Sequence, residues 1–184
     1  METGVDKCRL YIYNGSMKER NNNMKKAFVF DFDDTLAFTS ARVIVKHRGW
    51  QTKRLTPAQF NSYKLQEDEE FCFHEFCDPK LIINGERTKF MSFAMTVFTE
   101  GHPVFILTAR SDSVANAIQQ FLRTFGITAK AIHCVGKDAE TDIPKAKRQV
   151  LLSIIENHDI VYFYDDDEAN VEAAKEIGVK SYKV

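Results

Sequence analysis

Residues 27–36 read Ala-Phe-Val-Phe-Asp-Phe-Asp-Asp-Thr-Leu, an apolar run that ends in three carboxylates and a hydroxyl. Four consecutive apolar residues predict a strand that is buried on both faces, as in a parallel sheet covered by helices. In open α/β sheets, ligands bind beyond the carboxyl ends of the strands. The strand would therefore deliver Asp31 and Asp33 to such an edge, where one carboxylate can attack a substrate while the other transfers protons.

Two plainer interpretations of this stretch have to be weighed. An EF-hand calcium loop also begins Asp-x-Asp, but Leu36 stands where that loop requires glycine. An acidic loop in solvent is the other alternative. Only the segments that follow can decide between this loop and a catalytic strand end.

The rest of the chain alternates between strand and helix patterns. Further apolar runs predict strands at 104–107, 131–135, 160–164 and 179–182. Between them, apolar residues recur at helical spacing, and Gly101, Gly126 and Gly178 stand where C-terminal caps belong. This alternation predicts an α/β fold, with a parallel sheet, right-handed crossovers and a helix layer on each face.

At 184 residues the chain is long enough for one domain with a small insertion. We expect this domain to cover residues 27–184, with the insertion at about 38–85. Residues 1–26 are polar and predict a loosely ordered leader, in which Met24 is an alternative start.

The insertion has its own pattern. Residues 43–45 and 51–55 flank Arg48-Gly49 and predict a β-hairpin, followed by a short helix with Thr56 as its N-cap. Residues 67–70 predict a solvated acidic loop. Cys72, His74 and Cys77 are interleaved with phenylalanines, which favours a half-buried strand over a metal site.

Composition excludes several classes of protein. The chain has 25 Lys and Arg against 26 Asp and Glu, so it is neither a basic histone-like protein nor an acidic one. Its four cysteines lack zinc-type spacing, and no signal segment opens the chain, which favours a reducing cytoplasm. No run approaches the ~20 apolar residues of a membrane span.

If the strands that end at Asp31, Thr108 and Asp165 are neighbours, their tips bring four carboxylates into one crevice. Such a group repels itself unless a divalent cation neutralises it, and oxygen ligands without converging His or Cys favour Mg²⁺ over zinc. A phosphate group then fits as the substrate. Thr108, the amides that open the next helix and a lysine would bind its remaining oxygens.

With these residues in order, the chain resembles the haloacid dehalogenase (HAD) superfamily of phosphatases over roughly residues 27–182. The first motif, D-x-D-x-[TV], stands at residues 31–35. The second, an apolar strand that ends in Ser or Thr, ends at Thr108, and the fourth, paired acids after an apolar strand, is Asp165-Asp166. The resemblance implies a three-layer, Rossmann-like core with a small flap or cap inserted after the first strand.

The same resemblance implies roles for these residues. Asp31 would be the nucleophile, and Asp33 the acid and base whose backbone carbonyl also binds Mg²⁺. Asp166 would bind the metal directly, with Asp165 in its outer shell. The phosphate would bind at Thr108, Ala109 and Arg110. The third motif, a lysine, falls on Lys147 or Lys145, of which we favour Lys147; Lys137 lies farther upstream.

Asp33 separates two reaction classes, because dehalogenases of the superfamily lack this second aspartate and phosphatases need it. The resemblance therefore favours Mg²⁺-dependent hydrolysis of phosphomonoesters through an aspartyl-phosphate. Phosphotransferases of the β-phosphoglucomutase type share these residues and stay open. A non-catalytic binding protein on the same fold is the alternative of a different class.

The substrate is predicted from the insertion. Its basic residues surround Trp50, as in a surface that binds a nucleic-acid strand; they are Arg42, Lys46, His47, Arg48, Lys53 and Arg54. The chain is also similar, more loosely, to the phosphatase half of polynucleotide kinase/phosphatases, so DNA or RNA ends are candidate substrates. A solvated hairpin whose Trp packs on the sheet is the alternative, and with it a phosphatase of nucleotides or sugar phosphates. The sequence predicts no oligomeric state.

Overall fold

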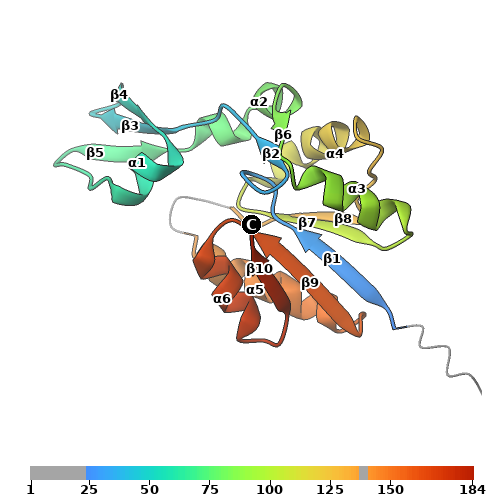
Figure 1. Ribbon diagram of the computed structural model, residues 1–184. Coiled ribbons are helices and arrows are strands. Elements are labelled where there is room, and N and C mark those ends of the chain that lie inside the picture. Colours follow the sequence, from blue (N-terminus) through green and yellow to red (C-terminus); the bar gives the residue numbers. More distant parts are fainter. Residues whose placement is uncertain (1–23, 137–140) are drawn as a thin grey trace, which may run out of the picture.

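The computed structural model of the chain describes residues 24–136 and 141–184 (Figure 1). The opening strand, β1 (Lys26–Phe30), lies in the middle of a five-stranded parallel sheet with the order β10-β9-β1-β7-β8. The other strands of this sheet are β7 (Val104–Thr108), β8 (Ala131–Cys134), β9 (Ile160–Asp165) and β10 (Lys180–Lys183). Each lies within one residue of its predicted bounds, so the α/β prediction is confirmed.

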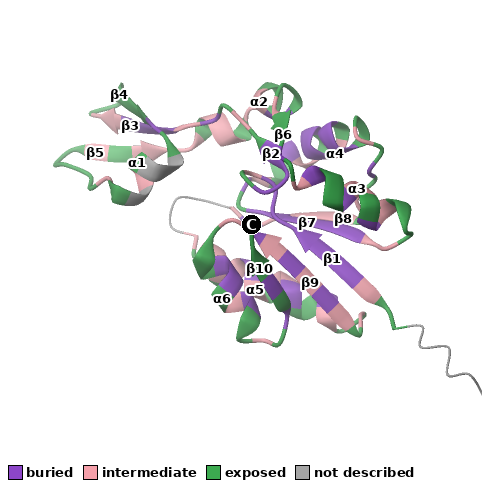
Figure 2. Ribbon diagram, in the orientation of Figure 1, coloured by how far each residue is buried: buried purple, intermediate pink, exposed green. Residues whose placement is uncertain are grey.

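Both faces of the sheet are covered because β1 is apolar on both sides. Phe28 and Phe30 pack toward α3 (Met91–Thr99) and α4 (Ala115–Arg123), which the single turn η2 (Asp112–Val114) precedes. Ala27 and Val29 pack toward α5 (Ile143–Ile155) and α6 (Glu168–Lys175). The result is the predicted three-layer core, and the buried residues in Figure 2 concentrate on β1 and β7.

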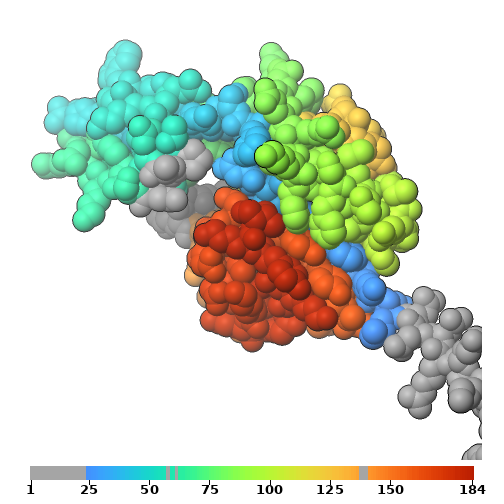
Figure 3. All heavy atoms as spheres, viewed as in Figure 1, coloured from blue at the N-terminus to red at the C-terminus, as the bar shows by residue number. Residues whose placement is uncertain are grey.

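The insertion forms a second, smaller lobe, which we call the flap (residues 38–85; Figure 3). Its antiparallel sheet has the order β4-β3-β5, with β3 (Val43–His47), β4 (Trp50–Leu55) and β5 (Glu69–Cys72). This confirms the predicted hairpin. The predicted helix is α1 (Pro57–Ser62), and the Thr56 hydroxyl caps it by accepting a hydrogen bond from the Gln59 amide. Val43, Val45 and Leu55 form the centre of a separate apolar core.

Two expectations for the flap are wrong. Residues 69 and 70 begin β5 instead of continuing a loop, because they pair with His47 and Lys46 of β3. The Glu69 carboxylate also accepts hydrogen bonds from the Tyr63 hydroxyl at 2.8 Å and the Gln66 amide at 2.9 Å. The half-buried strand ends at Cys72, and residues 74–77 form the 3-10 turn η1 (His74–Cys77). Its Phe76 amide donates to the Phe73 carbonyl at 3.0 Å, a local bond that a strand would not make.

Short elements absent from the sequence prediction lie where the flap meets the core. They are α2 (Pro79–Ile83) and the antiparallel pair of β2 (Ala37–Phe38) and β6 (Glu86–Arg87). Within residues 24–136 and 141–184, no helix is both long and apolar enough to cross a membrane. Most of the predicted leader (residues 1–23, with Cys8) and Lys137 lie outside the described residues.

Candidate active site

The three strand tips predicted to meet are neighbours in the sheet, because β1 lies between β9 and β7. Asp31 follows β1 directly, and its amide donates to the Tyr164 carbonyl of β9 at 2.9 Å. Thr108 ends β7 and Asp165 ends β9. The sequence prediction of one shared edge is thereby confirmed.

A buried lysine connects two of these tips. Lys147, on α5, donates to Oδ1 of Asp31 at 2.6 Å and to Oδ2 of Asp165 at 2.7 Å, and its side chain is only 2% exposed. The other oxygen of Asp165 accepts from the Asp167 amide at 2.9 Å and from Nδ2 of Asn170 at 3.0 Å. Lys145, the second candidate for the third motif, is exposed.

The charges at this edge do not balance. Burial disfavours the charged form of Lys147, but the carboxylates of Asp31 and Asp165 outweigh it and raise the pKa of the lysine, which is therefore charged. Burial also raises the pKa of Asp31; Lys147 opposes that rise, while Asp165 and Asp33 add to it. The pKa of Asp166 rises to about 6, through burial and then the charge of Asp165. The edge therefore carries more carboxylates than one lysine neutralises.

Asp33 is engaged by a different cation. Arg110, two residues beyond β7, donates from Nε to Oδ2 of Asp33 at 2.7 Å and from Nη2 to Oδ1 at 2.6 Å, a two-pronged ion pair. Nη2 also donates to the Thr39 hydroxyl at 2.9 Å, and Nη1 donates to the Phe76 carbonyl at 2.7 Å. The Arg110 side chain is 1% exposed and that of Asp33 26%. The substrate-binding role expected for Arg110 stays a prediction.

The remaining residues of the predicted phosphate loop lie against β8. Thr108 is buried, and its hydroxyl oxygen accepts a hydrogen bond from the Arg110 amide at 3.2 Å. Ala109 is exposed, but its carbonyl faces Gly136, where an added Cβ would lie 1.9 Å from that oxygen. Gly136 therefore permits the close approach of this loop, which the sequence analysis did not anticipate.

The two flap residues predicted to bind substrate lie at the β3–β4 turn and not on the strand tips that carry the carboxylates. Arg48 and Trp50 flank the hairpin turn, at the end of β3 and β4 that points away from the five-stranded sheet (Figure 1). Trp50 is 80% exposed, so it does not pack on the sheet. Arg48 pairs with Asp68 at 3.0 Å.

Besides Gly136, the sequence analysis missed three contributors to the site: Asn170, which orients Asp165, and Thr39 and the Phe76 carbonyl, which contact Arg110. Asn170 had a weak signal, since it lies in the first turn of the helix after the paired acids. Thr39 and Phe76 had none, because their role depends on how the flap folds back.

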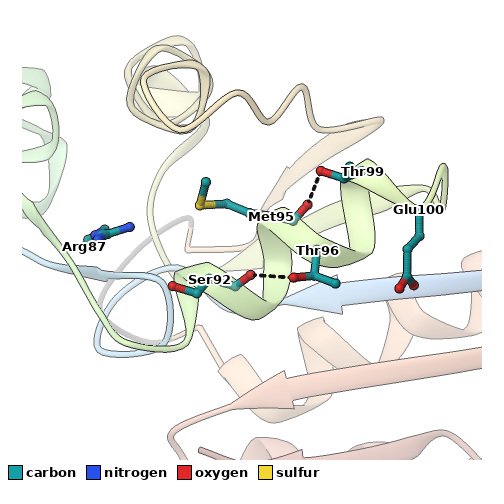
Figure 4. Close-up of a pocket in the computed structure, with 6 residues that line it drawn as sticks. All are labelled: Arg87, Ser92, Met95, Thr96, Thr99 and Glu100. Carbon is teal, nitrogen blue, oxygen red and sulfur yellow. Dashed lines mark hydrogen bonds between the residues drawn. The ribbon is translucent and has the colours of Figure 1, made fainter.

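No three His, Cys, Asp or Glu side chains among the described residues are grouped as a ready metal site. A shallow groove of about 400 Å³ lies elsewhere, along α3 (Figure 4). Two of its threonines bond within their own helix, Thr96 to the Ser92 carbonyl at 3.1 Å and Thr99 to the Met95 carbonyl at 2.8 Å. The groove contains no predicted site residue, and we assign it no function.

Comparison with known proteins rests on structure alone. No protein-family model matches the sequence, and no curated protein sequence matches it. Among solved structures, a chain of the Pnkp1/Rnl/Hen1 RNA repair complex is similar with a TM-score of 0.60 and 14% identity, over 89% of this chain and 43% of that one. The match to a second structure of that complex covers 56% of the chain in that structure. The present chain therefore spans about half the length of these relatives.

Two further structures match over most of both chains. A HAD-superfamily hydrolase of subfamily IA from Geobacter sulfurreducens PCA has a TM-score of 0.54 and 16% identity, with 89% of each chain covered. CbbY from Rhodobacter sphaeroides, solved in complex with phosphate, has a TM-score of 0.53 and 16% identity, with 86% of this chain and 84% of that one covered. At such identities the likeness defines the fold, and the chain has the fold of the haloacid dehalogenase-like hydrolases.

Proposed function

We propose that the chain is a Mg²⁺-dependent phosphomonoester hydrolase that works through an aspartyl-phosphate on Asp31. The observation that carries the proposal is the buried ammonium of Lys147 between Asp31 and Asp165. A buried carboxylate at a strand tip, held by a charged lysine, is suited to nucleophilic catalysis on an anionic substrate. The likeness to HAD hydrolases supports the same reaction class.

In the proposed mechanism, Lys147 occupies Oδ1 of Asp31 and leaves Oδ2 to attack phosphorus. As the new Asp31–phosphorus bond forms, the bond from phosphorus to the ester oxygen breaks, and Asp33 donates its proton to the leaving alcohol. Asp33 then takes a proton from water, whose oxygen attacks phosphorus. The bond from Asp31 to phosphorus breaks as the bond to the water oxygen forms, so inorganic phosphate leaves and Asp31 is regenerated as a carboxylate.

The phosphate has donors beside the nucleophile. The Thr108 hydroxyl accepts a hydrogen bond from the Arg110 amide, so its own proton is available for a phosphate oxygen. Lys147 supplies a fixed positive charge on the other side of Asp31. We infer that these two groups orient the phosphate for attack in line with the leaving oxygen.

The donor set fits Mg²⁺. The metal would be held by the carboxylates of Asp31 and Asp166 and by the backbone carbonyl of Asp33, with Asp165 in the outer shell. Only two side chains would therefore bind the metal directly. Burial is the main cause of the raised pKa values of Asp31 and Asp166, and the charge of Asp165 adds to both. A divalent cation would offset this charge when the carboxylates ionise. When bound, Mg²⁺ would neutralise charge on the transferring phosphate.

For the substrate we propose the phosphorylated end of a nucleic acid. The likeness to chains of an RNA repair complex supports this class, although the activities and partners of that assembly belong to longer proteins. The exposed Trp50 at the hairpin turn, beside basic residues, supports it independently because bases stack on exposed indole rings.

A second candidate is a small phosphate ester, such as a nucleotide or sugar phosphate. Ion pairs within the flap favour it: Arg48 with Asp68, Lys53 with Glu69 and Arg54 with Glu75. Each pair reduces the positive charge that the hairpin presents to a nucleic-acid backbone. The proposed chemistry is the same for both candidates.

One panel of substrates tests the reaction and separates the candidates. The purified chain is assayed with Mg²⁺ on p-nitrophenyl phosphate, a sugar phosphate, a mononucleotide, and DNA and RNA oligonucleotides phosphorylated at the 3′ or 5′ end. We expect turnover that EDTA abolishes, and its loss by several powers of ten in Asp31→Asn. Release of phosphate that is equally fast from Asp31→Asn would overturn the mechanism. Absence of turnover on every ester would favour a binding protein.

A further inference from the structure

Arg110 lies where the core, the loop that follows β1 and the flap meet. Its guanidinium binds both carboxylate oxygens of Asp33, the hydroxyl of Thr39 and the carbonyl of Phe76 in η1. We propose that Arg110 is a positioning residue that holds the Asp33 carboxylate for proton transfer and ties its orientation to the position of the flap. This inference rests on the proposed acid and base role of Asp33.

The contacts of Arg110 favour positioning over substrate binding. A guanidinium has five N–H groups, and four of these are directed at Asp33, Thr39 and Phe76. The Cζ atom of Arg110 also lies 5.1 Å from the ring centre of Phe76 and 6.0 Å from that of Phe32. A buried arginine held by so many partners is already fixed before any ligand arrives.

The same contacts distinguish the two oxygens of Asp33. Oδ1 accepts from Nη2 of Arg110 and from the Thr39 hydroxyl at 3.0 Å, whereas Oδ2 accepts from Nε alone among the groups of residues 24–136 and 141–184. A carboxylate oxygen accepts about two hydrogen bonds, so Oδ2 keeps a position for a proton. The Asp33 side chain is partly exposed, which gives a leaving group or water access to that oxygen.

The flap is joined through η1 to the contacts that Arg110 makes with Asp33 and Thr39, which we call the clamp. Glu75, beside Phe76, accepts from the Arg42 amide at 2.9 Å and from Nη2 of Arg54 at 2.8 Å, so η1 is bonded to the residue that precedes β3 and to β4. A displacement of the hairpin therefore moves the Phe76 carbonyl relative to Arg110. The clamp on Asp33 changes when the flap moves, because one guanidinium serves both contacts.

Kinetics of Arg110 variants on p-nitrophenyl phosphate test the positioning role. This ester is too small to contact the hairpin turn, and the assay uses saturating Mg²⁺. We expect Arg110→Ala to lower kcat by about 100-fold or more, as for loss of an oriented catalytic group, while KM changes by less than about threefold. Added guanidinium ion should restore part of kcat. Arg110→Lys should remain impaired, because one ammonium cannot make the two-pronged contact.

Arg148→Ala is the matched control, since it removes an arginine from an exposed ion pair with Glu176 and does not contact Asp33. We expect its kcat to equal that of the wild type. If Arg110→Ala does not fold, Thr39→Val removes one hydroxyl from the same clamp and should lower kcat by about threefold to tenfold. A rise in KM with unchanged kcat in Arg110→Ala would overturn the inference in favour of substrate binding, and unchanged kinetics in Thr39→Val would overturn it if only that variant folds.

Hydrogen exchange tests the link to the flap without any need for activity. Amides in residues 73–78 should exchange at least about tenfold faster in Arg110→Ala than in the wild type or Arg148→Ala. Equal exchange would overturn the coupling. The two hypotheses fail separately: a wild type that hydrolyses no ester ends the proposed function, whereas an active wild type with an equally active Arg110→Ala ends only the positioning role.

Discussion

Lys147 Nζ lies 2.6 Å from Oδ1 of Asp31, a residue 116 positions earlier in the chain. The contact forms because α5 packs against the sheet face that Ala27 and Val29 line, which brings the lysine behind the tip of β1. The same Nζ reaches Asp165 at the tip of β9. One buried cation therefore fixes two carboxylates that leave the sheet on adjacent strands.

Replacing Lys147 by alanine should be far more damaging than replacing Lys145. Lys147→Ala leaves two buried carboxylates without their cation, and we expect a loss of about 3–5 kcal/mol in the free energy of unfolding together with a fall in kcat of about 100-fold or more. Lys145→Ala, an exposed position on the same helix, should stay within about 0.5 kcal/mol of the wild type. Urea denaturation and turnover of p-nitrophenyl phosphate measure both. The opposite ranking would move the third motif to Lys145.

The stability of the metal-free chain should fall as pH rises through the titration range of Asp166. The pKa of this carboxyl is raised from an ordinary value of 3.8 to about 6 in the folded chain. The folded state then binds the proton more tightly than the unfolded state, so protonation stabilises the fold at low pH, and this stabilisation is lost between those two values. Asp31 acts in the same direction, since its pKa is also raised.

Thermal unfolding in EDTA at about pH 5 and about pH 7.5 measures this dependence. Asp166→Asn should flatten the trend in part, because Asp31 and Asp34, whose pKa values burial also raises, remain. Added Mg²⁺ should raise the melting temperature most at the higher pH, where the carboxylates are ionised. An Asp166→Asn variant with the same pH dependence as the wild type would contradict the assignment.

Gly136→Ala should disturb the loop after β7. The added Cβ would meet the Ala109 carbonyl oxygen at 1.9 Å, and both backbones are held there by the hydrogen bond from the Gly136 amide to the Arg110 carbonyl. We expect a loss of roughly 1–3 kcal/mol in stability and a lower kcat, because Thr108 and Arg110 shift with the loop. Gly126→Ala is the control: its φ of +75° strains a side chain, but its Cβ meets nothing within 4 Å, so stability should fall without a change in kcat.

The sheet could be predicted because each core strand is a contiguous apolar run, and the helices because their apolar residues recur at helical spacing. The pairing of Arg110 with Phe76 and Thr39 could not, since these residues lie 34 and 71 positions away and no local pattern records their approach. The η1 turn had a signal that was misinterpreted: Phe71 and Phe73 keep the two-residue period of a strand, but Phe76 breaks it.

The last prediction concerns the flap as a nucleic-acid surface. Trp50 and Arg48 lie at the turn between β3 and β4, and these flap strands lie apart from the five-stranded sheet (Figure 1), so we expect the two residues to contact nucleotides several positions from the terminal phosphate. Trp50→Ala and Arg48→Ala should therefore raise KM for a phosphorylated oligonucleotide and leave KM for a mononucleotide unchanged. Loss of one stacked base, worth roughly 1–3 kcal/mol, corresponds to an increase of about fivefold to about 150-fold for Trp50→Ala.

The salt dependence of KM, and its comparison between an oligonucleotide and a small ester, separate this role from a general loss of charge. KM for the oligonucleotide should rise steeply with salt in the wild type, and Arg48→Ala should reduce that slope because it removes a basic contact. Arg123→Ala removes a positive charge at the end of α4, outside the flap, and should change neither KM nor the slope. If Trp50→Ala raises KM equally for the oligonucleotide and for p-nitrophenyl phosphate, the hairpin supports the fold of the flap instead of binding a strand, and the small-ester candidate is favoured.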